Sequence, residues 1–166
     1  MVQIIQVRSQ KDIKDVKILI YEFIDWLAER YPDLQDTIEA YFKQQGFDEE
    51  MANILQIFGP PHGECLLARI GDEPVGIVMM KPHGGSECEM NRMFVRNSAR
   101  RQRVAKALTD QLFASARELG YQRMILSALD KHYEALPLYC KLGFNDDARP
   151  ADSGDDAHEV RMALNL

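Results

Sequence analysis

The residues of this chain best able to do chemistry are the basic side chains between Asn91 and Lys106. This stretch of sixteen residues holds six basic residues and no acidic one, whereas the whole chain has a formal net charge of −6. The other 150 residues therefore sum to −12. Because the local field decides where an anion binds, this contrast predicts an anion site. The six basic residues are Arg92, Arg96, Arg100, Arg101, Arg103 and Lys106.

The position of this basic stretch indicates which anion would bind. Residues 93–106 are predicted to run from the end of a strand into the start of a helix. A helix start presents free backbone N–H groups and the positive end of the helix dipole, and Arg100, Arg101 and Arg103 surround it here. The pattern predicts a phosphate site, with a merely solvated basic face as the alternative.

The composition is that of one globular domain spanning residues 1–166. Hydrophobic residues make up 46% and charged residues 28%, and the acidic balance argues against a polycation that binds nucleic acid. The three cysteines form no C-x-x-C pair and are expected to be reduced thiols in a cytoplasmic protein. Neither secretion nor a membrane span is expected, because the sequence has no signal-like N-terminus and no run of eighteen apolar residues.

No metal site is expected either. His62, Cys65, His83 and Cys88 fall on separate turns and strands without clean ligand spacing. The sequence also lacks the G-x-x-x-x-G-K-S/T, G-x-G-x-x-G and G-x-S-x-G motifs. Nucleoside triphosphate, dinucleotide and serine hydrolase chemistry therefore have no support.

Hydrophobic spacing predicts the elements that hold the basic stretch in place. A strand at 2–7 is followed by helices at about 13–31, 38–46 and 48–57. Three β-like runs separated by short turns predict an antiparallel meander at Glu64–Ile70, 75–81 and Glu87–Val95. A helix at about 104–119, a strand at 121–127, a helix at about 131–142 and a closing strand at 158–164 follow. This order predicts an α/β sheet that is antiparallel first and mixed later.

Three segments are similar to motifs of one enzyme family. The segment Glu89-Met90-Asn91-Arg92-Met93-Phe94-Val95 is similar to its E-M-x-R-x-x-V strand, and Arg100-Arg101-Gln102-Arg103-Val104-Ala105 to its acetyl-CoA motif Q/R-x-x-G-x-G/A. The segment Ala135-Leu136-Pro137-Leu138-Tyr139-Cys140-Lys141-Leu142-Gly143-Phe144 is similar to its A-x-x-L-Y-x-x-x-G-F helix ending. The chain therefore resembles the GNAT superfamily of N-acetyltransferases, and the order of elements extends the resemblance over essentially the whole domain.

The resemblance implies an α/β fold of the α+β type, with a mixed, mostly antiparallel sheet of six to seven strands flanked by helices. It implies acetyl-CoA as the co-substrate and no metal. The residues that it implies in cofactor binding lie at the strand end, at the helix start and before the last helix. They are Met93, Phe94, Val95, Arg100, Arg101, Gln102, Arg103, Val104, Ala105 and His132, the last where the family often has asparagine.

The implied reaction is transfer of an acetyl group to a primary amine by direct attack in a ternary complex. The amine is protonated near pH 7, so a base must deprotonate it, directly or through water. Glu89 is the candidate base, with Glu87 in reserve, and the alternative is an exposed carboxylate on a sheet. Tyr139 is the candidate acid beside the departing sulfur, with a core tyrosine as the alternative. Strand alternation predicts Glu89 on the same face as Met93, where backbone N–H groups would polarise the thioester carbonyl.

Two residues depart from the family pattern. Arg103 stands where the motif has its central glycine. This arginine either points outward and pairs with phosphate or fills the groove, and the first is favoured because helical φ and ψ need no glycine. It also motivates the alternative function, an acyl-CoA-binding sensor without turnover. Pro137 lies inside the last helix pattern and predicts a kink or a late helix start.

The acceptor is expected to be a small amine, an amino acid or a peptide N-terminus. The helices between Asp12 and Ile57 and the acidic loop at 145–156 would flank its cleft, and acidic walls suit a cationic acceptor. No nucleic-acid or membrane partner is expected, and the resemblance allows a homodimer.

Overall fold

The computed structural model describes residues 1–129, 132, 135–147 and 159–166 of the chain. Its first half contains β1 (Val2–Gln6), α1 (Gln10–Arg30), a short 3-10 helix η1 (Pro32–Leu34), α2 (Gln35–Gln44), α3 (Phe47–Ala52), α4 (Ile54–Phe58) and β2 (Glu64–Ile70). Its second half contains β3 (Glu73–Gly84), β4 (Glu87–Val95), a 3-10 helix η2 (Asn97–Ala99), α5 (Val104–Glu118), β5 (Arg123–Leu129), α6 (Ala135–Lys141), β6 (Asn145–Asp146) and β7 (Glu159–Asn165).

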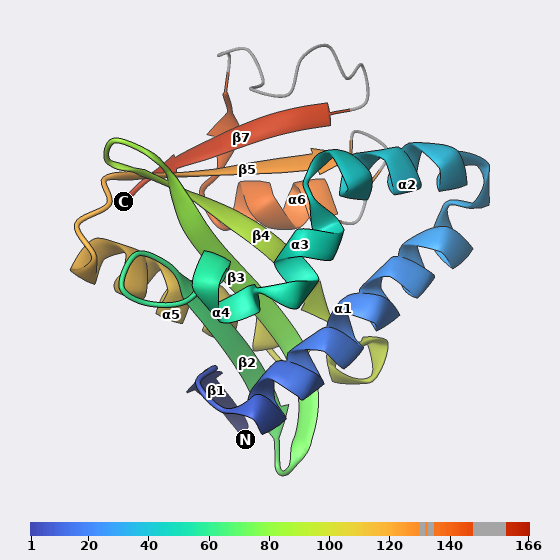
Figure 1. Cartoon of the computed structure of the whole chain (residues 1–166), viewed down its shortest axis with the longest axis horizontal. Coiled ribbons are helices and arrows are strands. Elements are labelled where there is room, and N and C mark those ends of the chain that lie inside the picture. Colours follow the sequence, from blue (N-terminus) through green and yellow to red (C-terminus); the bar gives the residue numbers. More distant parts are fainter. Residues whose placement is uncertain (130–131, 133–134, 148–158) are drawn as a thin grey trace.

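The seven strands form one sheet in the order β1-β2-β3-β4-β5-β7-β6 (Figure 1). The pairs β1–β2, β2–β3, β3–β4, β5–β7 and β6–β7 are antiparallel, and β4–β5 is parallel. This confirms the predicted α/β fold with a mixed, mostly antiparallel sheet of six to seven strands.

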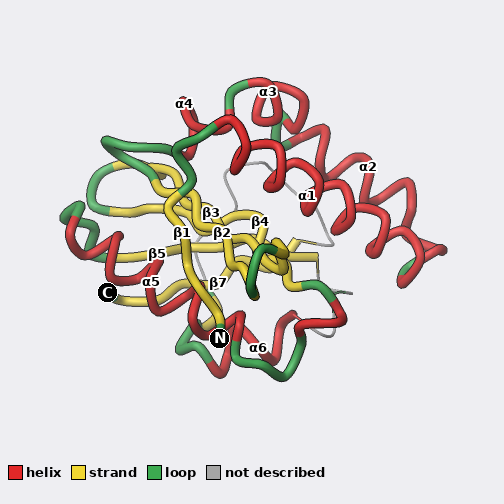
Figure 2. Tube along the Cα trace, turned by 90° about the horizontal axis from the view of Figure 1, so that it is seen from below, coloured by secondary structure: helices red, strands yellow, loops and turns green. Residues whose placement is uncertain are grey.

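Helices cover both faces of the sheet (Figure 2). Helices α1, α3 and α4 pack on one face around a buried cluster that includes Leu19, Ile54 and Phe58. Helices α5 and α6 pack on the other face around a larger cluster that includes Leu108 and Leu112. Each of these helices packs its apolar face against the sheet, as the amphipathic spacing of the sequence predicts.

Helix α1 is stabilised at its start by the residues that the sequence offers there. The Ser9 Oγ accepts a hydrogen bond from the backbone N–H of Asp12 at 3.1 Å, which is a standard N-cap. The helix ends at Arg30, two residues before Pro32. Its length matters for the site, because its second half brings Phe23 and Trp26 to the edge of the sheet.

Strand β4 contains a bulge at Arg92, whose φ is 54°. The register with β3 shifts between Ile77 and Met79, so two residues of β4 oppose one residue of β3. Met93 consequently packs in the cluster under α5 and α6, whereas Phe94 packs in the cluster under α1. Beyond the bulge, the side chains of β4 therefore face the opposite helical layer from the one that simple alternation predicts.

The expected sharing of one face by Glu89 and Met93 is wrong for this reason. Glu89 lies opposite Lys81 of β3, and Lys81 contacts Glu50 of α3. Glu89 is therefore on the face that α1 to α4 cover, whereas Met93 is on the α5 and α6 face. Simple alternation fails because the sequence does not signal the extra residue of the bulge.

Strands β4 and β5 pair over a short length only. The parallel register joins Glu87, Cys88 and Glu89 to Arg123, Met124 and Ile125, and the recorded pairing ends there. Beyond that point the two strands diverge (Figure 1). The bulge at Arg92 lies on the diverging part of β4, where increased local twist is expected.

Several boundaries differ from those predicted, including the following three. The helix expected at 48–57 is interrupted at Asn53, whose φ of −135° ends α3 before α4 begins. The last helix, expected at about 131–142, is described as α6 over Ala135–Lys141, and residues 133–134 before it lie outside the described residues. The acidic loop expected at 145–156 is in part the short strand β6, and its residues 148–156 lie outside the described residues.

Candidate active site

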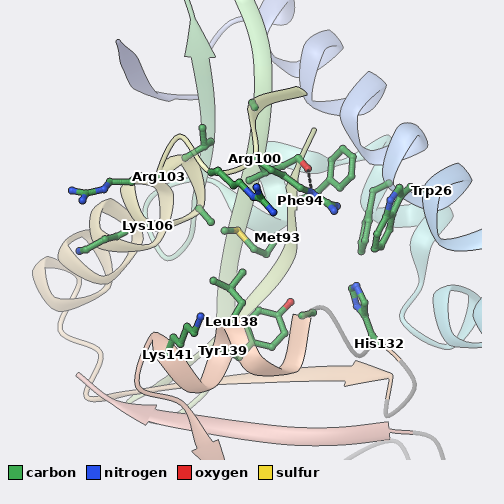
Figure 3. Close-up of a pocket in the computed structure, with 17 residues that line it drawn as sticks. Trp26, Met93, Phe94, Arg100, Arg103, Lys106, His132, Leu138, Tyr139 and Lys141 are labelled. Atoms are coloured by element: carbon green, nitrogen blue, oxygen red, sulfur yellow. Dashed lines mark hydrogen bonds between the residues drawn. The ribbon is translucent and has the colours of Figure 1, made fainter. Parts of the chain in front are cut away.

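A cavity of about 570 Å³ lies where β4 ends, α5 begins and α6 crosses beneath them (Figure 3). Arg103 and Lys106 lie at one end of the cavity and Trp26 and His132 at the other. The residues that line it are Phe23, Trp26, Met93, Phe94, Val95, Ala99, Arg100, Arg101, Arg103, Val104, Ala105, Lys106, His132, Ala135, Leu138, Tyr139 and Lys141.

Nine of the ten residues that the sequence predicted for cofactor binding line this cavity. The exception is Gln102, whose Nε2 instead donates a hydrogen bond to the Ser98 carbonyl at 3.2 Å. Gln102 thus makes a hydrogen bond within the turn and not toward the cavity. Lys106 lines the cavity although it was counted only as part of the basic stretch, and Lys141 of α6 adds a cation that no motif signalled.

The turn before α5 has a left-handed backbone at two arginines. Arg101 has a φ of 66°, and Arg103, the N-cap of α5, has a φ of 61° and a ψ of 20°. The expectation of a helical backbone at Arg103 is therefore wrong. The family motif has glycine at this position, and a residue with a Cβ costs roughly 1–2 kcal/mol there.

The start of α5 presents backbone donors to the cavity. Arg103 makes no side-chain capping hydrogen bond, and the first intrahelical bond recorded runs from the Ala107 N–H to the Arg103 carbonyl. The N–H groups before Ala107 are the ones that a helix leaves without intrahelical partners. Val104, Ala105 and Lys106 carry three of them and line the cavity. With the positive helix end, they form an anion-binding arrangement.

Aromatic rings form the wall opposite the basic end. The guanidinium of Arg100 lies 4.9 Å from the ring centroid of Trp26, and its Nε donates a hydrogen bond to the Val95 carbonyl at 3.4 Å. The His132 ring lies 5.6 Å from that of Trp26 and 6.3 Å from that of Phe23. Phe23 and Trp26 of α1 therefore form part of the cavity wall.

Tyr139 is held by α6 beneath Met93 of β4. Its hydroxyl points up from α6 toward Met93 (Figure 3), and the residue is 8% exposed. Burial raises the pKa of the Tyr139 phenol to about 12, because the charged phenolate loses solvation. Tyr139 is therefore a hydrogen-bond donor at neutral pH.

Glu89 lies near the site but lines neither of the two cavities described here. Its Oε1 accepts a hydrogen bond from the Asn91 Nδ2 at 3.3 Å, and its Oε2 lies 3.9 Å from the His83 Nδ1. Glu87, the reserve base, is engaged at 2.9 Å by the Nη1 of Arg123. The role of Glu89 stays a prediction.

A second cavity of about 50 Å³ adjoins the first. The two share Phe23, Met93, His132 and Tyr139 as lining residues. The smaller cavity lies in the space where β4 and β5 diverge, under α1 and α2. Its other lining residues are Leu27, Tyr41, Phe42, Met90, Asn91, Arg92, Leu126, Ser127, Ala128 and Leu129.

A buried ion pair fixes the bulge beside the smaller cavity. The Arg92 Nη2 lies 2.7 Å from the Glu50 Oε2, with side-chain exposures of 4% and 6%. The Arg92 Nη1 donates a hydrogen bond to the Gln45 Oε1 at 2.7 Å, and the guanidinium carbon lies 4.8 Å from the Phe42 ring centroid. These contacts join β4 to α2 and α3. No motif in the sequence signalled them.

Residues 20–144 match the acetyltransferase (GNAT) family. The chain belongs to the GNAT family of acetyltransferases. An uncharacterized N-acetyltransferase of Schizosaccharomyces pombe is 35% identical over 147 residues, which cover 86% of this chain and 82% of that protein. These findings confirm the resemblance drawn from the motifs. This GNAT protein is an acetyltransferase enzyme, and acyl-CoA-dependent acetyl transfer is its general activity.

Solved structures of GNAT proteins have the same fold. A GNAT acetyltransferase from Staphylococcus aureus Mu50 superposes with a TM-score of 0.77 at 20% identity and covers 100% of this chain and 99% of that one. The PaiA N-acetyltransferase of Thermoplasma acidophilum, in complex with coenzyme A, gives a TM-score of 0.75 at 15% identity, with coverages of 100% and 99%.

Two further findings concern the described part of this GNAT chain. None of its described helices is long and apolar enough to cross a membrane. Its described residues contain no group of three or more His, Cys, Asp or Glu side chains placed to hold a metal ion.

Proposed function

We propose that this enzyme transfers the acetyl group of acetyl-CoA to a primary amine by direct attack in a ternary complex. The observation that carries the proposal is the meeting of two cavities at Met93, His132 and Tyr139. A large cavity with a basic end and a small cavity with mixed polar and apolar walls suit two different substrates. Their junction is where a thioester and an amine would react.

The residues of the large cavity fit acetyl-CoA. The uncapped start of α5, with Arg100, Arg101, Arg103 and Lys106 around it, supplies donors and positive charge for the pyrophosphate. Apolar residues continue from there toward Tyr139 and suit the less polar arm of the molecule; they are Met93, Val95, Ala135 and Leu138. When bound, acetyl-CoA supplies an activated acetyl group as a thioester.

The amine nitrogen forms the new C–N bond as the C–S bond breaks, and coenzyme A leaves as a thiolate that then takes a proton from water. Tyr139 donates a hydrogen bond to the departing sulfur. With a pKa of about 12, Tyr139 is a weaker acid than an ordinary thiol with a pKa near 8.5. Complete proton transfer from the phenol is thus unfavourable, and its contribution is stabilisation of developing negative charge.

Glu89 is the base in this proposal, and it accepts the proton of the amine through water. Its position outside both cavities supports the water-mediated route over direct contact. Backbone N–H groups around Met93 and Phe94 polarise the thioester carbonyl. The bulge supports this role, because a bulge leaves backbone groups out of the strand ladder.

The acceptor class comprises small amines, amino acids and peptide N-termini. Thiol release from acetyl-CoA is measured over a panel of these amines, with acetyl-CoA alone as the blank. At least one amine is expected to accelerate release, and Glu89→Gln is expected to lower kcat by about 10²–10⁴-fold. Acetyl-CoA binding without thiol release for every amine contradicts the proposal and favours the acyl-CoA sensor.

A further inference from the structure

Asn91 carries an unused hydrogen-bond acceptor beside the smaller cavity. The residue lines this cavity and is 7% exposed. Its Oδ1 is buried and has no hydrogen-bond partner among the residues that the structure describes. A buried carbonyl without a partner is destabilising by about 1–3 kcal/mol, so a native protein that keeps one invites a functional explanation.

The neighbouring carboxylate decides which end of the Asn91 amide is available. The Glu89 Oε1 accepts a hydrogen bond from the Asn91 Nδ2 at 3.3 Å. An ionised carboxylate only accepts hydrogen bonds, so it holds the NH₂ group of the amide toward itself. The oxygen is left for a donor from another molecule. The terminal torsion of asparagine is soft, so a small rotation turns Oδ1 into the cavity that the residue lines.

The size and walls of the cavity limit what that donor is attached to. A cavity of about 50 Å³ has room for a few water molecules, and therefore for an amino group and its adjoining carbon. Its walls are partly apolar, from Phe23, Leu27, Phe42 and Leu129, and partly polar, from Asn91, Arg92, Ser127 and His132.

The cation of this cavity is already engaged. Arg92 is held by Glu50 and Gln45. A carboxylate on the carbon next to the amine would therefore be buried without a free ionic partner in Arg92, which is unfavourable. The cavity thus favours amines over α-amino acids.

We propose that the Asn91 Oδ1 accepts a hydrogen bond from the acceptor amine, and that the cavity admits primary amines on an unbranched carbon that lacks a carboxylate. This inference rests on the proposed function. In it, Asn91 is a substrate-binding residue, and Glu89 also acts as a positioning residue because it orients the Asn91 amide. The hydrogen bond points the lone pair of the amine away from Asn91 and toward the larger cavity, where the thioester lies.

The test uses n-butylamine, sec-butylamine and alanine as probes with the full-length enzyme and acetyl-CoA. The wild-type protein is expected to turn over n-butylamine, with kcat/KM about tenfold or more above that for sec-butylamine or alanine. Asn91→Leu is expected to raise the KM for n-butylamine about tenfold, which is the effect of one lost hydrogen bond. The Kd for acetyl-CoA is expected to stay unchanged.

Three other variants make the result specific. Asn165→Leu makes the same change at an exposed position of β7 and is expected to leave every parameter at its wild-type value. Glu89→Gln keeps an oxygen that accepts from the Asn91 Nδ2, so it is expected to lower kcat with little change in the KM for n-butylamine. Acetyl-CoA is expected to raise the melting temperature of the wild-type protein. If Asn91→Leu shows no such rise, Asn91→Ser is used in its place.

The outcomes separate this inference from the proposed function. Turnover of n-butylamine with an unchanged KM in the Asn91 variants overturns the inference and leaves acetyl transfer intact. Turnover of sec-butylamine or alanine as fast as n-butylamine overturns the unbranched acceptor class alone. Absence of thiol release with every amine of the wider panel overturns the proposed function, and the inference with it.

Discussion

Replacing Glu50 with leucine tests whether the buried ion pair holds the bulge of β4 in place. Glu50 is 5% exposed, and its Oε2 lies 2.7 Å from the Arg92 Nη2. Removing it leaves the guanidinium buried with the Gln45 oxygen and the Phe42 and Phe47 rings as partners among the described residues. Breaking a buried pair by removing one partner is destabilising by about 3–5 kcal/mol. For a chain of this size that lowers the Tm by roughly 6–20 °C.

The measurement is urea unfolding of the wild-type protein, Glu50→Leu, Arg92→Leu and the double variant at one pH. Glu49→Leu is the matched control, because Glu49 is the exposed neighbour on the same helix and is expected to change stability by about 0.5 kcal/mol or less. The double variant is expected to be far more stable than the sum of the single losses predicts, because it buries no unpaired charge. The midpoint for loss of acetyl transfer is expected to follow the unfolding midpoint.

Two results would refute this reasoning. A loss below about 1 kcal/mol in Glu50→Leu means that the pair does not hold α3 against β4. Additive losses in the double variant mean that the two side chains do not interact energetically, whatever their separation.

Three further predictions concern the turn, the phenol and the thiols. In urea unfolding, Arg103→Gly is expected to be about 1 kcal/mol more stable than Arg103→Ala. Both variants lose the charge, but only glycine accepts a φ of 61° without strain. Equal stabilities of the two variants would contradict the left-handed turn. Tyr139→Phe is expected to lower kcat about tenfold or more. The wild-type kcat is expected to show no loss from phenol ionisation between pH 7 and 10, because the Tyr139 pKa is raised to about 12. In the unfolded chain the tyrosine pKa is near 10, so the stability that protonated Tyr139 contributes is constant below pH 10 and is lost as the pH rises toward 12. If the free energy of unfolding of Tyr139→Phe falls as steeply over this pH range as that of the wild-type protein, the result argues against this assignment. Thiol titration of the native protein is expected to find one reactive cysteine, the exposed Cys140, because Cys65 and Cys88 are buried and burial raises the pKa of both thiols; two or three fast thiols contradict the buried placement.

The sequence was sufficient to predict the elements whose patterns are local. The strands Glu64–Ile70 and Glu87–Val95 have the predicted bounds, because alternating apolar residues between turn signals define them. The start of α5 at Val104 was likewise predicted, since a basic turn followed by helical spacing marks it. The basic residues around this helix start predicted a phosphate site, and the match to a family motif then implied acetyl-CoA as the ligand; both stay predictions.

The parts that sequence reasoning missed depend on tertiary contacts. The bulge at Arg92 is stabilised by partners on α2 and α3, more than forty residues earlier in the chain, so no local signal announces it. The left-handed Arg103 was missed because an arginine gives no hint of a positive φ, whereas the family's glycine does. Asn91 was treated only as part of the strand motif, and its unused oxygen emerges only from packing.

The most direct test of the central claim follows the acetyl group itself. Acetyl-CoA labelled in the acetyl group is incubated with the wild-type enzyme and the amine that gives the fastest thiol release. The account predicts that the label appears on the amine nitrogen in equal amount to the thiol released, and that little label appears as free acetate. Label found only in acetate, or thiol release that does not depend on the amine, would contradict acetyl transfer to an amine at this site.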